Sequence, residues 1–199
     1  ILNHSKKSKN NIGFLATASK DNKEKINKFY KRFENTGSEL SHFNLTSDID
    51  GFHEWLLNKD IVYVGGGNTF YMLEIWKKNS LEQVFKKAYE KGLILSGVSA
   101  GAVCWFDWIL SDSMGLGFKP LKGINLIEGS CTPHSSNIER INEFKLNIKN
   151  NKLPNGIAID DGVAVVFIDG KPTEVYSTVD NQGAYFLDKN KKINLKEYI

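Results

Sequence analysis

The sequence predicts an α/β fold: a three-layer sandwich with a mostly parallel central sheet, helices on both faces, and antiparallel strands near the C-terminus. Two observations support this prediction. Apolar segments of strand length alternate with helix-periodic segments through the first half of the chain, as in parallel sheets covered by helices. The last third contains short apolar segments separated by turn signals, which is typical of antiparallel strands.

The first β-α-β unit lies near the beginning of the chain. Residues 12–19 (IGFLATAS) are apolar or small and predict a buried strand. Residues 43–46 are expected to form the second strand. Residues 21–35, between them, are mostly polar but carry apolar side chains at helical spacing, namely Ile26, Phe29, Tyr30 and Phe33.

Two further strands run into glycine-rich segments. Residues 61–64 (IVYV) predict a strand that stops at Gly65–Gly67, after which Asn68 caps a helix. Residues 93–95 predict another strand, which runs directly into Gly97–Gly101 (GVSAG). Ligands of open α/β sheets bind at the carboxyl ends of strands, so both glycine segments are candidate functional loops.

The C-terminal third predicts antiparallel strands joined by turns. The turns are Asp160-Asp161-Gly162 and Asp169-Gly170, and the strands are residues 156–159, 163–168, 173–177 and 184–187. Residues 107–123, which contain three glycines, are expected to form a loop over the site. We predict one domain over residues 1–199, because the chain is too short for two comfortable domains. Since residue 1 is not Met, we expect residues to be missing from the front.

The charge balance argues against a nucleic-acid partner. The chain has 26 basic and 23 acidic residues, for a formal net charge of +3, and polyanion-binding proteins usually carry a larger basic excess. Two small basic clusters lie near the chain ends and are interpreted as solvated termini. They comprise Lys6, Lys7 and Lys9, and Lys189, Lys191 and Lys192.

The cysteines and apolar runs exclude several other classes of protein. Cys104 and Cys131 lack the spacing of a zinc or redox site and are too few for a disulfide framework, so we expect a cytoplasmic protein without metal or cofactor. No apolar run approaches the roughly 20 residues that a membrane helix needs, and no leader opens the chain.

The GVSAG segment predicts a nucleophile elbow centred on Ser99. A tight turn from a strand into a helix forces its central residue into strained backbone angles, and glycines two positions on either side avoid collisions there. The Ser99 hydroxyl would then project above the sheet. The backbone N–H of Ala100 and that of Gly67, from the other glycine loop, are expected to form an oxyanion hole. Gly66 and Asn68 of that loop are expected to contact substrate.

A serine nucleophile needs a base, and the chain has four histidines. His134 follows a short strand-like segment downstream of Ser99, whereas His4 lies in the polar leader and the other two precede the glycine loop, so His134 is the predicted base. The group that orients it is less determined. Asp112, between Ser99 and His134, is preferred, and Asp107, Glu128 and Asp161 stay open as alternatives.

The elbow GVSAGA, the loop VGGGNT and Pro133-His134 together resemble the peptidase E family, which includes dipeptidase E and cyanophycinase-like serine peptidases. The match runs in order from about Ile61 to Arg140. The resemblance implies a class I glutamine-amidotransferase-like fold and hydrolysis of dipeptides or short peptides with an N-terminal Asp. It maps Ser99 onto the nucleophile and His134 onto the base.

The resemblance gives two further assignments. The acid of the family lies in a Thr-Asn-Asp-Met-like stretch that corresponds to residues 111–114 (SDSM), where strict register places Ser113, rather than Asp112, on the acid. The family also has an Arg after the catalytic His that is associated with acidic substrates. Arg140 is the candidate for gripping an aspartyl carboxylate here.

Other functions stay open. A class I amidotransferase would need a Cys at the elbow, where this chain has Ser99. A serine esterase of the α/β-hydrolase type shares the order of nucleophile, acid and base. A catalytically inactive binding or regulatory homologue could keep the elbow as a fold element. For the enzyme, the expected partner is a short peptide, with neither nucleic acid nor membrane, and a homodimer is left open.

Overall fold

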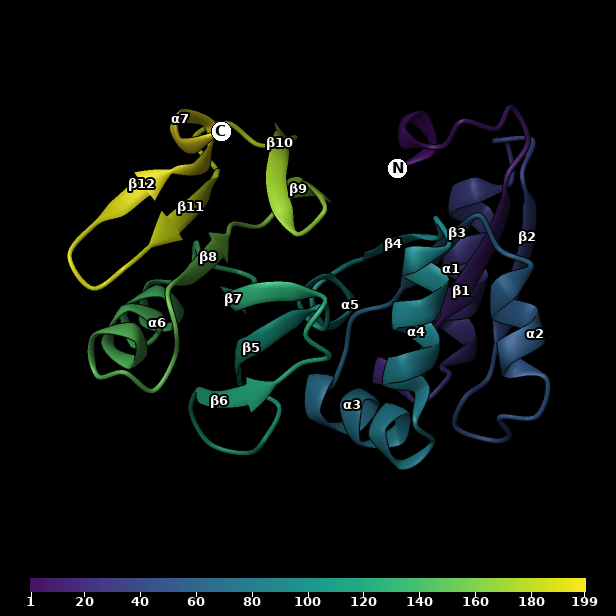
Figure 1. The fold of residues 1–199 in the computed structure, drawn as a ribbon, viewed down its shortest axis with the longest axis horizontal. Coiled ribbons are helices and arrows are strands. Elements are labelled where there is room, and N and C mark those ends of the chain that lie inside the picture. The colour runs from purple at the N-terminus through teal and green to yellow at the C-terminus, as the bar shows by residue number, and fades with distance from the viewer. The chain divides into compact units, whose positions relative to one another are not determined.

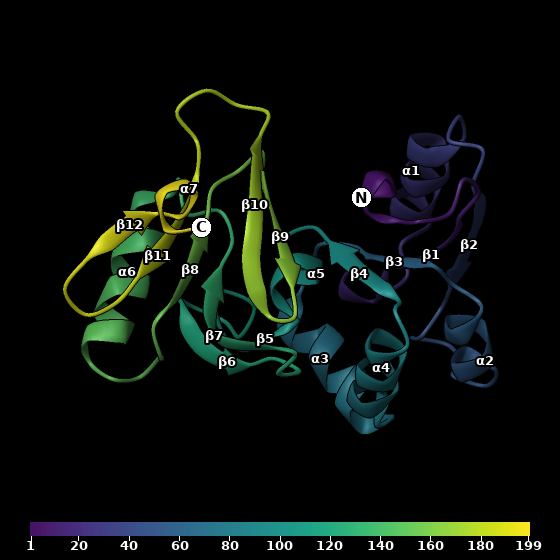
Figure 2. The same cartoon turned by 45° about the horizontal axis from the view of Figure 1, so that its top comes forward.

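The computed structural model describes residues 1–199 and divides into two compact units, residues 1–102 and residues 103–199. Each unit has its own main sheet (Figures 1 and 2). The fold class predicted from the sequence is confirmed: the structure is mixed α/β, with mostly parallel strands, surrounding helices, and antiparallel strands near the C-terminus. The single domain over residues 1–199 stays a prediction.

The first unit is built on a parallel sheet of order β2-β1-β3-β4. Its strands are β1 (Asn11–Leu15), β2 (Glu39–Phe43), β3 (Ile61–Val64) and β4 (Ile94–Gly97). Its helices are α1 (Lys23–Phe33), α2 (Phe52–Leu57), α3 (Thr69–Lys78) and α4 (Leu81–Glu90), with 3-10 turns η1 (Leu2–His4) and η2 (Thr17–Ser19). The short helix α5 (Ala100–Val103) follows β4.

Helices cover both faces of this sheet, and successive residues of β1 contact helices on opposite faces. Phe14 stacks on Phe29 of α1, with ring centroids 4.8 Å apart. The preceding position faces α2, where a Cβ added to Gly13 would lie 2.5 Å from the Trp55 ring. Successive strand residues point to opposite faces, so α1 and α2 pack on opposite sides of the sheet. Gly13 is thus required by the close approach of Trp55.

Two strand boundaries in the first unit differ from the prediction. The strand predicted over residues 12–19 ends at Leu15, and η2 follows it. The second strand occupies Glu39–Phe43 instead of residues 43–46. It lies at the edge of the sheet and contains no fully buried side chain, so its sequence lacks the apolar run that marks the central strands.

The second unit is built on a six-stranded sheet of order β12-β11-β8-β7-β5-β6. Strands β5, β7 and β8 are parallel, while β6, β11 and β12 pair antiparallel. A separate antiparallel hairpin is formed by β9 and β10. The bounds are β5 (Phe106–Ser111), β6 (Lys119–Lys122), β7 (Ile127–Thr132), α6 (Ile138–Lys149), β8 (Gly156–Ile159), β9 (Val163–Ile168), β10 (Lys171–Ser177), β11 (Ala184–Leu187), β12 (Lys192–Asn194) and α7 (Leu195–Tyr198).

Helix α6 packs on this sheet through a buried apolar stripe. Ile141, Phe144 and Ile148 lie at helical spacing and form one cluster with Leu110 of β5 and Ala158 of β8. This packing fixes the N-terminal end of α6, where the chain arrives from β7. No helix in either unit combines the length and the apolar character that a membrane span requires.

The loop predicted over residues 107–123 is wrong for much of its length. Residues 106–111 form β5 and residues 119–122 form β6, paired antiparallel with Ser111 opposite Lys119. The three glycines misled the prediction because Gly115 and Gly117 lie in the turn between the two strands, both with positive φ. Only that turn is irregular.

Candidate active site

Ser99 occupies the sharp turn between β4 and α5 that the sequence predicts. Its φ is +54°, in the left-handed region that side chains rarely adopt. Strand β4 ends at Gly97, two residues before it, and α5 begins at Ala100. A strained residue between a strand and a helix is the geometry of a nucleophile elbow.

The glycines on either side of Ser99 are required by close backbone contacts. A Cβ added to Gly97 would lie 2.3 Å from the carbonyl oxygen of Gly101, and one added to Gly101 would lie 2.1 Å from that of Val64. Both distances are far inside van der Waals contact. The GVSAG spacing therefore lets β4 and α5 turn tightly against the end of β3.

The second glycine loop lies directly against Ser99. Strand β3 pairs with β4, with Val64 opposite Gly97, so the loops at their carboxyl ends are neighbours. A Cβ added to Gly66 would lie 3.2 Å from the Ser99 Cβ and 3.8 Å from its Oγ. A side chain at position 66 would therefore crowd the nucleophile, and glycine keeps this space open.

The rest of this loop is held by hydrogen bonds within the first unit. Gly67 has φ of +151°, and a Cβ there would lie 2.2 Å from the carbonyl oxygen of Ala18. Asn68 N–H donates to that same oxygen at 2.7 Å, while its side chain accepts from Tyr71 N–H at 2.7 Å as the cap of α3. Lys25 Nζ donates to Gly66 O at 2.8 Å. The loop is thus fixed beside Ser99, with the Asn68 amide oxygen engaged as a helix cap.

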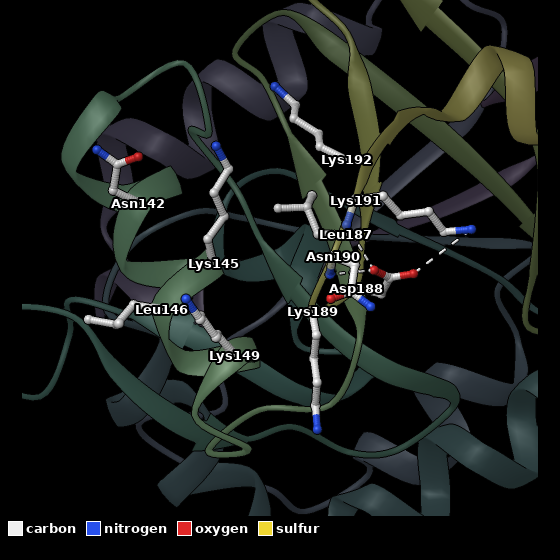
Figure 3. A pocket seen from close by; sticks show the side chains of 10 residues that line it. All are labelled: Asn142, Lys145, Leu146, Lys149, Leu187, Asp188, Lys189, Asn190, Lys191 and Lys192. Carbon is white, nitrogen blue, oxygen red and sulfur yellow. Dashed lines mark hydrogen bonds and ion pairs between the residues drawn. The ribbon is translucent and has the colours of Figure 1, made fainter.

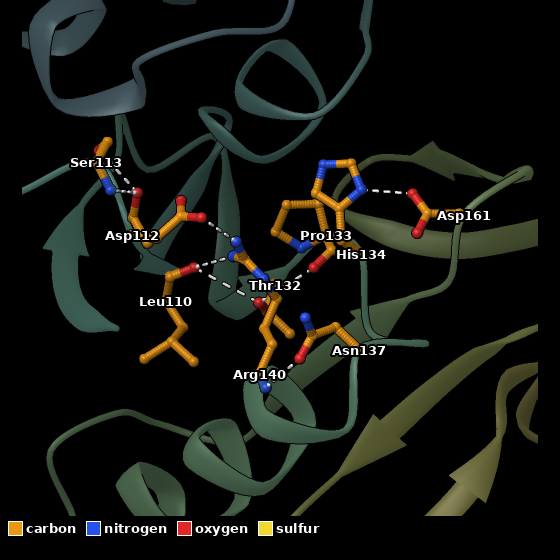
Figure 4. Close-up of polar contacts among 10 residues, drawn as sticks. Leu110, Asp112, Ser113, Thr132, Pro133, His134, Asn137, Arg140 and Asp161 are labelled. Carbon is orange, nitrogen blue, oxygen red and sulfur yellow. Dashed lines mark hydrogen bonds and ion pairs between the residues drawn. The ribbon is translucent and has the colours of Figure 1, made fainter. Parts of the chain in front are cut away.

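His134 lies in the second unit, at the carboxyl end of β7, and its Nδ1 contacts the carboxylate of Asp161 (Figure 4). Asp161 follows β8, the parallel neighbour of β7, with Thr132 opposite Ala158. The strand pairing therefore brings the His134 and Asp161 turns together. Like Ser99, His134 has φ of +54°, so both residues are held in a backbone conformation that other side chains seldom take.

Asp161 is held toward His134 by further contacts. Ser136 Oγ donates to Asp161 Oδ2 at 3.2 Å, and Asp161 N–H donates to Ser136 Oγ at 3.3 Å. The hydrogen bond from His134 is the main reason that the pKa of Asp161 lies below its ordinary value. The carboxylate is therefore ionised near neutral pH, as needed to orient an imidazole.

The neighbouring Asp160 has a different task. It is buried and accepts hydrogen bonds from Ser135 Oγ at 2.5 Å and from Gly183 N–H at 3.0 Å. Asp160 thus stabilises the turn, which leaves Asp161 to face His134. From the sequence, both residues have the pattern of turn formers, and Asp161 is an alternative to the preferred Asp112 as the acid. The position of Asp161 just after an apolar strand, like that of His134, is a signal that could have raised its priority.

Asp112 lies against Arg140 (Figure 4). Arg140 Nη2 donates to Asp112 Oδ2 at 2.6 Å, and Nη1 donates to Leu110 O at 3.4 Å. The guanidinium also lies over the Phe118 ring, 4.6 Å from its centroid. The side chain of Arg140 is only 7% exposed, whereas that of Asp112 is 63% exposed. Burial lowers the pKa of Arg140, and the charge of Asp112 opposes this change.

The other acid candidates lie in other settings. Asp107 accepts an ion pair from Lys122 at 2.9 Å across β5 and β6. Ser113, which strict register places on the acid, shares a hydrogen bond of 2.8 Å with the Ser111 hydroxyl. Glu128 lies on β7 and is exposed. Among the four acids considered, Asp161 is the one whose contact with His134 the structure shows.

Comparisons with known proteins identify peptidases that are similar to this chain. The model of Peptidase family S51 matches residues 1–175. YgaJ of Bacillus subtilis (strain 168), an uncharacterized peptidase, is 36% identical over 190 residues, covering 93% of this chain and 81% of that protein. Peptidase E of a Nostoc species is 28% identical over 112 residues, covering 55% of this chain and 45% of that protein.

Solved structures share the fold at low sequence identity. A peptidase from an acI-B1 Actinobacterium has a TM-score of 0.68 and 17% identity, covering 96% of this chain and 82% of that one. A Listeria monocytogenes EGD-e protein considered a peptidase E has a TM-score of 0.61 and 18% identity, covering 96% and 88%. The resemblance to peptidase E is confirmed. This chain belongs to peptidase family S51 and is a serine-type peptidase.

Proposed function

We propose that this peptidase hydrolyses dipeptides or short peptides through an acyl-enzyme, with Ser99 as nucleophile, His134 as general base and Asp161 as orienting acid. The observation that carries the proposal is the contact between His134 Nδ1 and the Asp161 carboxylate. An ionised acid on Nδ1 fixes the imidazole tautomer and leaves Nε2 as the basic nitrogen. The strained backbone of Ser99, with glycine at position 66 beside it, supports the role of nucleophile.

In the proposed first step, His134 Nε2 removes the hydroxyl proton as Ser99 Oγ bonds to the peptide carbonyl carbon. The C=O electron pair moves onto oxygen, where the N–H groups of Gly67 and Ala100 would donate hydrogen bonds. Each such donor contributes about 3 kcal/mol to transition-state stabilisation in serine hydrolases. As the C–N bond breaks, His134 transfers its proton to the leaving amine.

The second step releases the acyl group from Ser99. His134 removes a proton from water as the water oxygen bonds to the ester carbonyl carbon. Collapse of this intermediate breaks the bond to Ser99 Oγ, which takes the proton back from His134. The products are a free carboxylate and the regenerated enzyme, and no step calls on a metal or an organic cofactor.

The proposal replaces Asp112 by Asp161 as the third member of the triad. Asp112 is bound to Arg140, and the carboxylate in contact with His134 is that of Asp161. The same ion pair changes the expectation for Arg140. A buried guanidinium that already has a carboxylate partner has little capacity to bind another, so we assign Arg140 a structural role. Peptides with an N-terminal Asp stay the first substrates to assay because the family resemblance suggests them.

The test compares hydrolysis of Asp-Leu, Leu-Leu and acetyl-Asp-Leu by wild type and Ser99→Ala. We expect cleavage of one or both free dipeptides by wild type, none of the acetylated compound, and loss of activity in the variant. A fluorophosphonate probe should label wild type but not Ser99→Ala. Unchanged activity in a folded Ser99→Ala protein would refute the proposal. A wild type that neither labels nor cleaves would favour the inactive homologue.

A further inference from the structure

The second unit contains a hollow of about 500 Å³ between α6 and the hairpin of β11 and β12 (Figure 3). Five lysines and a single acidic side chain line it. Figure 3 shows side chains from both elements around this space. The lysines are Lys145, Lys149, Lys189, Lys191 and Lys192, and the acid is Asp188. None of these residues takes part in the proposed mechanism.

The lysines come from two segments that are distant in sequence. Lys145 and Lys149 are one turn apart on α6. Lys189 and Lys191 lie in the turn that follows β11, and Lys192 is the first residue of β12; all three line the hollow from the side of the hairpin. The sequence analysis interprets Lys189, Lys191 and Lys192 as a solvated terminus. The fold instead joins them with a second pair of lysines to form one basic surface.

The one acidic side chain in the hollow is committed to the hairpin turn. Asp188 Oδ1 accepts from the N–H groups of Asn190 and Lys191, at 2.8 and 2.9 Å. Its other oxygen lies 3.9 Å from Lys191 Nζ, at the limit of an ion pair. Asp188 keeps its negative charge, so the lining carries five positive charges against one negative charge.

The positive charges act on one another across the hollow. Burial is the main cause that lowers the pKa of Lys192, whose Nζ lies 3.4 Å from the centroid of the Tyr185 ring. The charge of Asp160 raises this pKa, and the smaller effect of Lys145, on α6, lowers it. Like charges that approach each other in a concave site are relieved when an anion binds between them.

We propose that this hollow binds a compact oligophosphate, an anion that carries several phosphate groups within a few ångströms. Lysine ammonium groups bind phosphate oxygens as point charges, without the planar two-point geometry by which arginine pairs with a carboxylate. An arginine fork, which suits a carboxylate, is absent from the lining. Five lysines around about 500 Å³ make a high charge density, and a chain of phosphates matches it better than dispersed carboxylates do.

The site is separate from the proposed catalytic residues of the second unit. Arg140 and the approach to His134 lie at the N-terminal end of α6, whereas Lys149 is the last residue of the helix. The lining also includes Asn142, two residues after Arg140, but it contains none of Arg140, His134 and Asp161. Occupancy of the hollow therefore does not require displacement of a peptide bound at His134.

Calorimetric titration of the full chain with sodium tripolyphosphate at low ionic strength tests the proposal. We expect one binding site on wild type and about tenfold weaker binding to Lys145→Gln/Lys149→Gln, because each surface charge pair contributes on the order of a few-fold in affinity. Lys189→Gln/Lys192→Gln, on the opposite wall, should weaken binding similarly. Because Lys189 and Lys192 lie outside α6, the second variant guards against a local effect on that helix.

The matched control is Lys87→Gln/Lys91→Gln. These lysines are also one turn apart and exposed at the end of a helix, α4, but lie outside the hollow. The control removes the same net charge from residues that do not line the hollow, and it should leave the affinity within about twofold. Equally weakened binding in control and test variants would mean that the net charge of the protein, and not the hollow, determines the affinity. That result would overturn the proposal.

Two other results would also overturn it. Tetra-aspartate that binds as tightly as tripolyphosphate would show a general carboxylate surface in place of a phosphate site. Wild type that shows no heat of binding at millimolar tripolyphosphate would show that the lysines are only solvated. Circular dichroism of every variant verifies that the fold is retained, so that weakened binding reports on the hollow.

Discussion

The Ser99 region and the His134 region are built in different ways. Ser99 owes its conformation to residues within two positions along the chain and to the end of one adjacent strand. His134 owes its partner to the pairing of β7 with β8, which brings Asp161 to it from a distant part of the sequence. The turn at Ser99 is thus visible as a motif, whereas the partner of His134 becomes visible only when the strand order is known.

The two regions nevertheless share one device. Ser99 and His134 both have φ of +54° and both follow the last residues of parallel strands. Left-handed backbone at a non-glycine residue costs on the order of 1–2 kcal/mol and persists where the surroundings enforce it. The left-handed backbone at both residues indicates that the orientation of each one is constrained within its own unit.

The largest predicted effect is a loss of activity on substitution of Asp161, the partner of His134. Asp161→Asn should reduce kcat by roughly 10³-fold or more, because an amide in place of the carboxylate no longer favours the Nδ1–H tautomer of His134. Asp112→Asn should retain at least about a tenth of the activity, because Asp112 contacts Arg140. Steady-state kinetics on the best dipeptide provides the measurement. The reverse ranking would return the acid to Asp112.

A second prediction addresses the local construction of the elbow. Gly101→Ala should destabilise the protein by several kcal/mol or prevent folding, because its Cβ would collide with Val64. Gly92→Ala is the control: its Cβ would meet nothing within 4 Å, but its φ of +96° is unfavourable for alanine. It should cost only about 1–2 kcal/mol. Chemical unfolding of both variants would separate collision from backbone strain, and equal losses would contradict the steric account.

A third prediction tests the structural role that we assign to Arg140. Asp112→Asn should lower the free energy of unfolding by about 1 kcal/mol, because a mostly buried guanidinium loses a charged partner that is itself largely exposed. Asp107→Asn removes an ion pair with an exposed lysine and should cost less. Urea unfolding curves give both values. A larger loss in Asp107→Asn would show that burial of Arg140 is not the deciding factor.

The smallest predicted effect is a pH dependence of stability at Asp161. Its folded-state pKa lies below the ordinary value of about 3.9, so its carboxylate contributes stability above that pH and loses it as the pH falls through the folded-state pKa. The stability difference between wild type and Asp161→Asn should therefore shrink as the pH is lowered from 6 toward about 3. Unfolding curves across this range provide the test, and a constant difference would show that ionisation of Asp161 is irrelevant to folding.

Some features of the site followed from local sequence. The glycine segments predicted the approach of two loops, and the structure places Gly66 against Ser99. Asn68 was predicted to cap a helix, and it does so through Tyr71 N–H. Such features depend on backbone conformation over a few residues, where sequence is most informative.

Other features depended on partners far apart in the chain. Sequence order favoured Asp112 because it lies between Ser99 and His134, but the fold gives Asp112 to Arg140. Proximity along the chain says little about which side chains meet across a sheet. The same limit hid the lysine hollow, because Lys145 and Lys192 meet only when α6 packs beside the hairpin.

The sequence by itself determined the α/β class, the tight strand-to-helix turn at Ser99 and the glycine loop beside it. Each is set by periodicity or by steric demands on a few consecutive residues. Tertiary structure alone decided that Asp161 faces His134, that Asp112 neutralises Arg140, and that two groups of lysines share one hollow. The physical reason is that strand register and helix packing, which choose among several equally charged side chains, arise from the whole buried core.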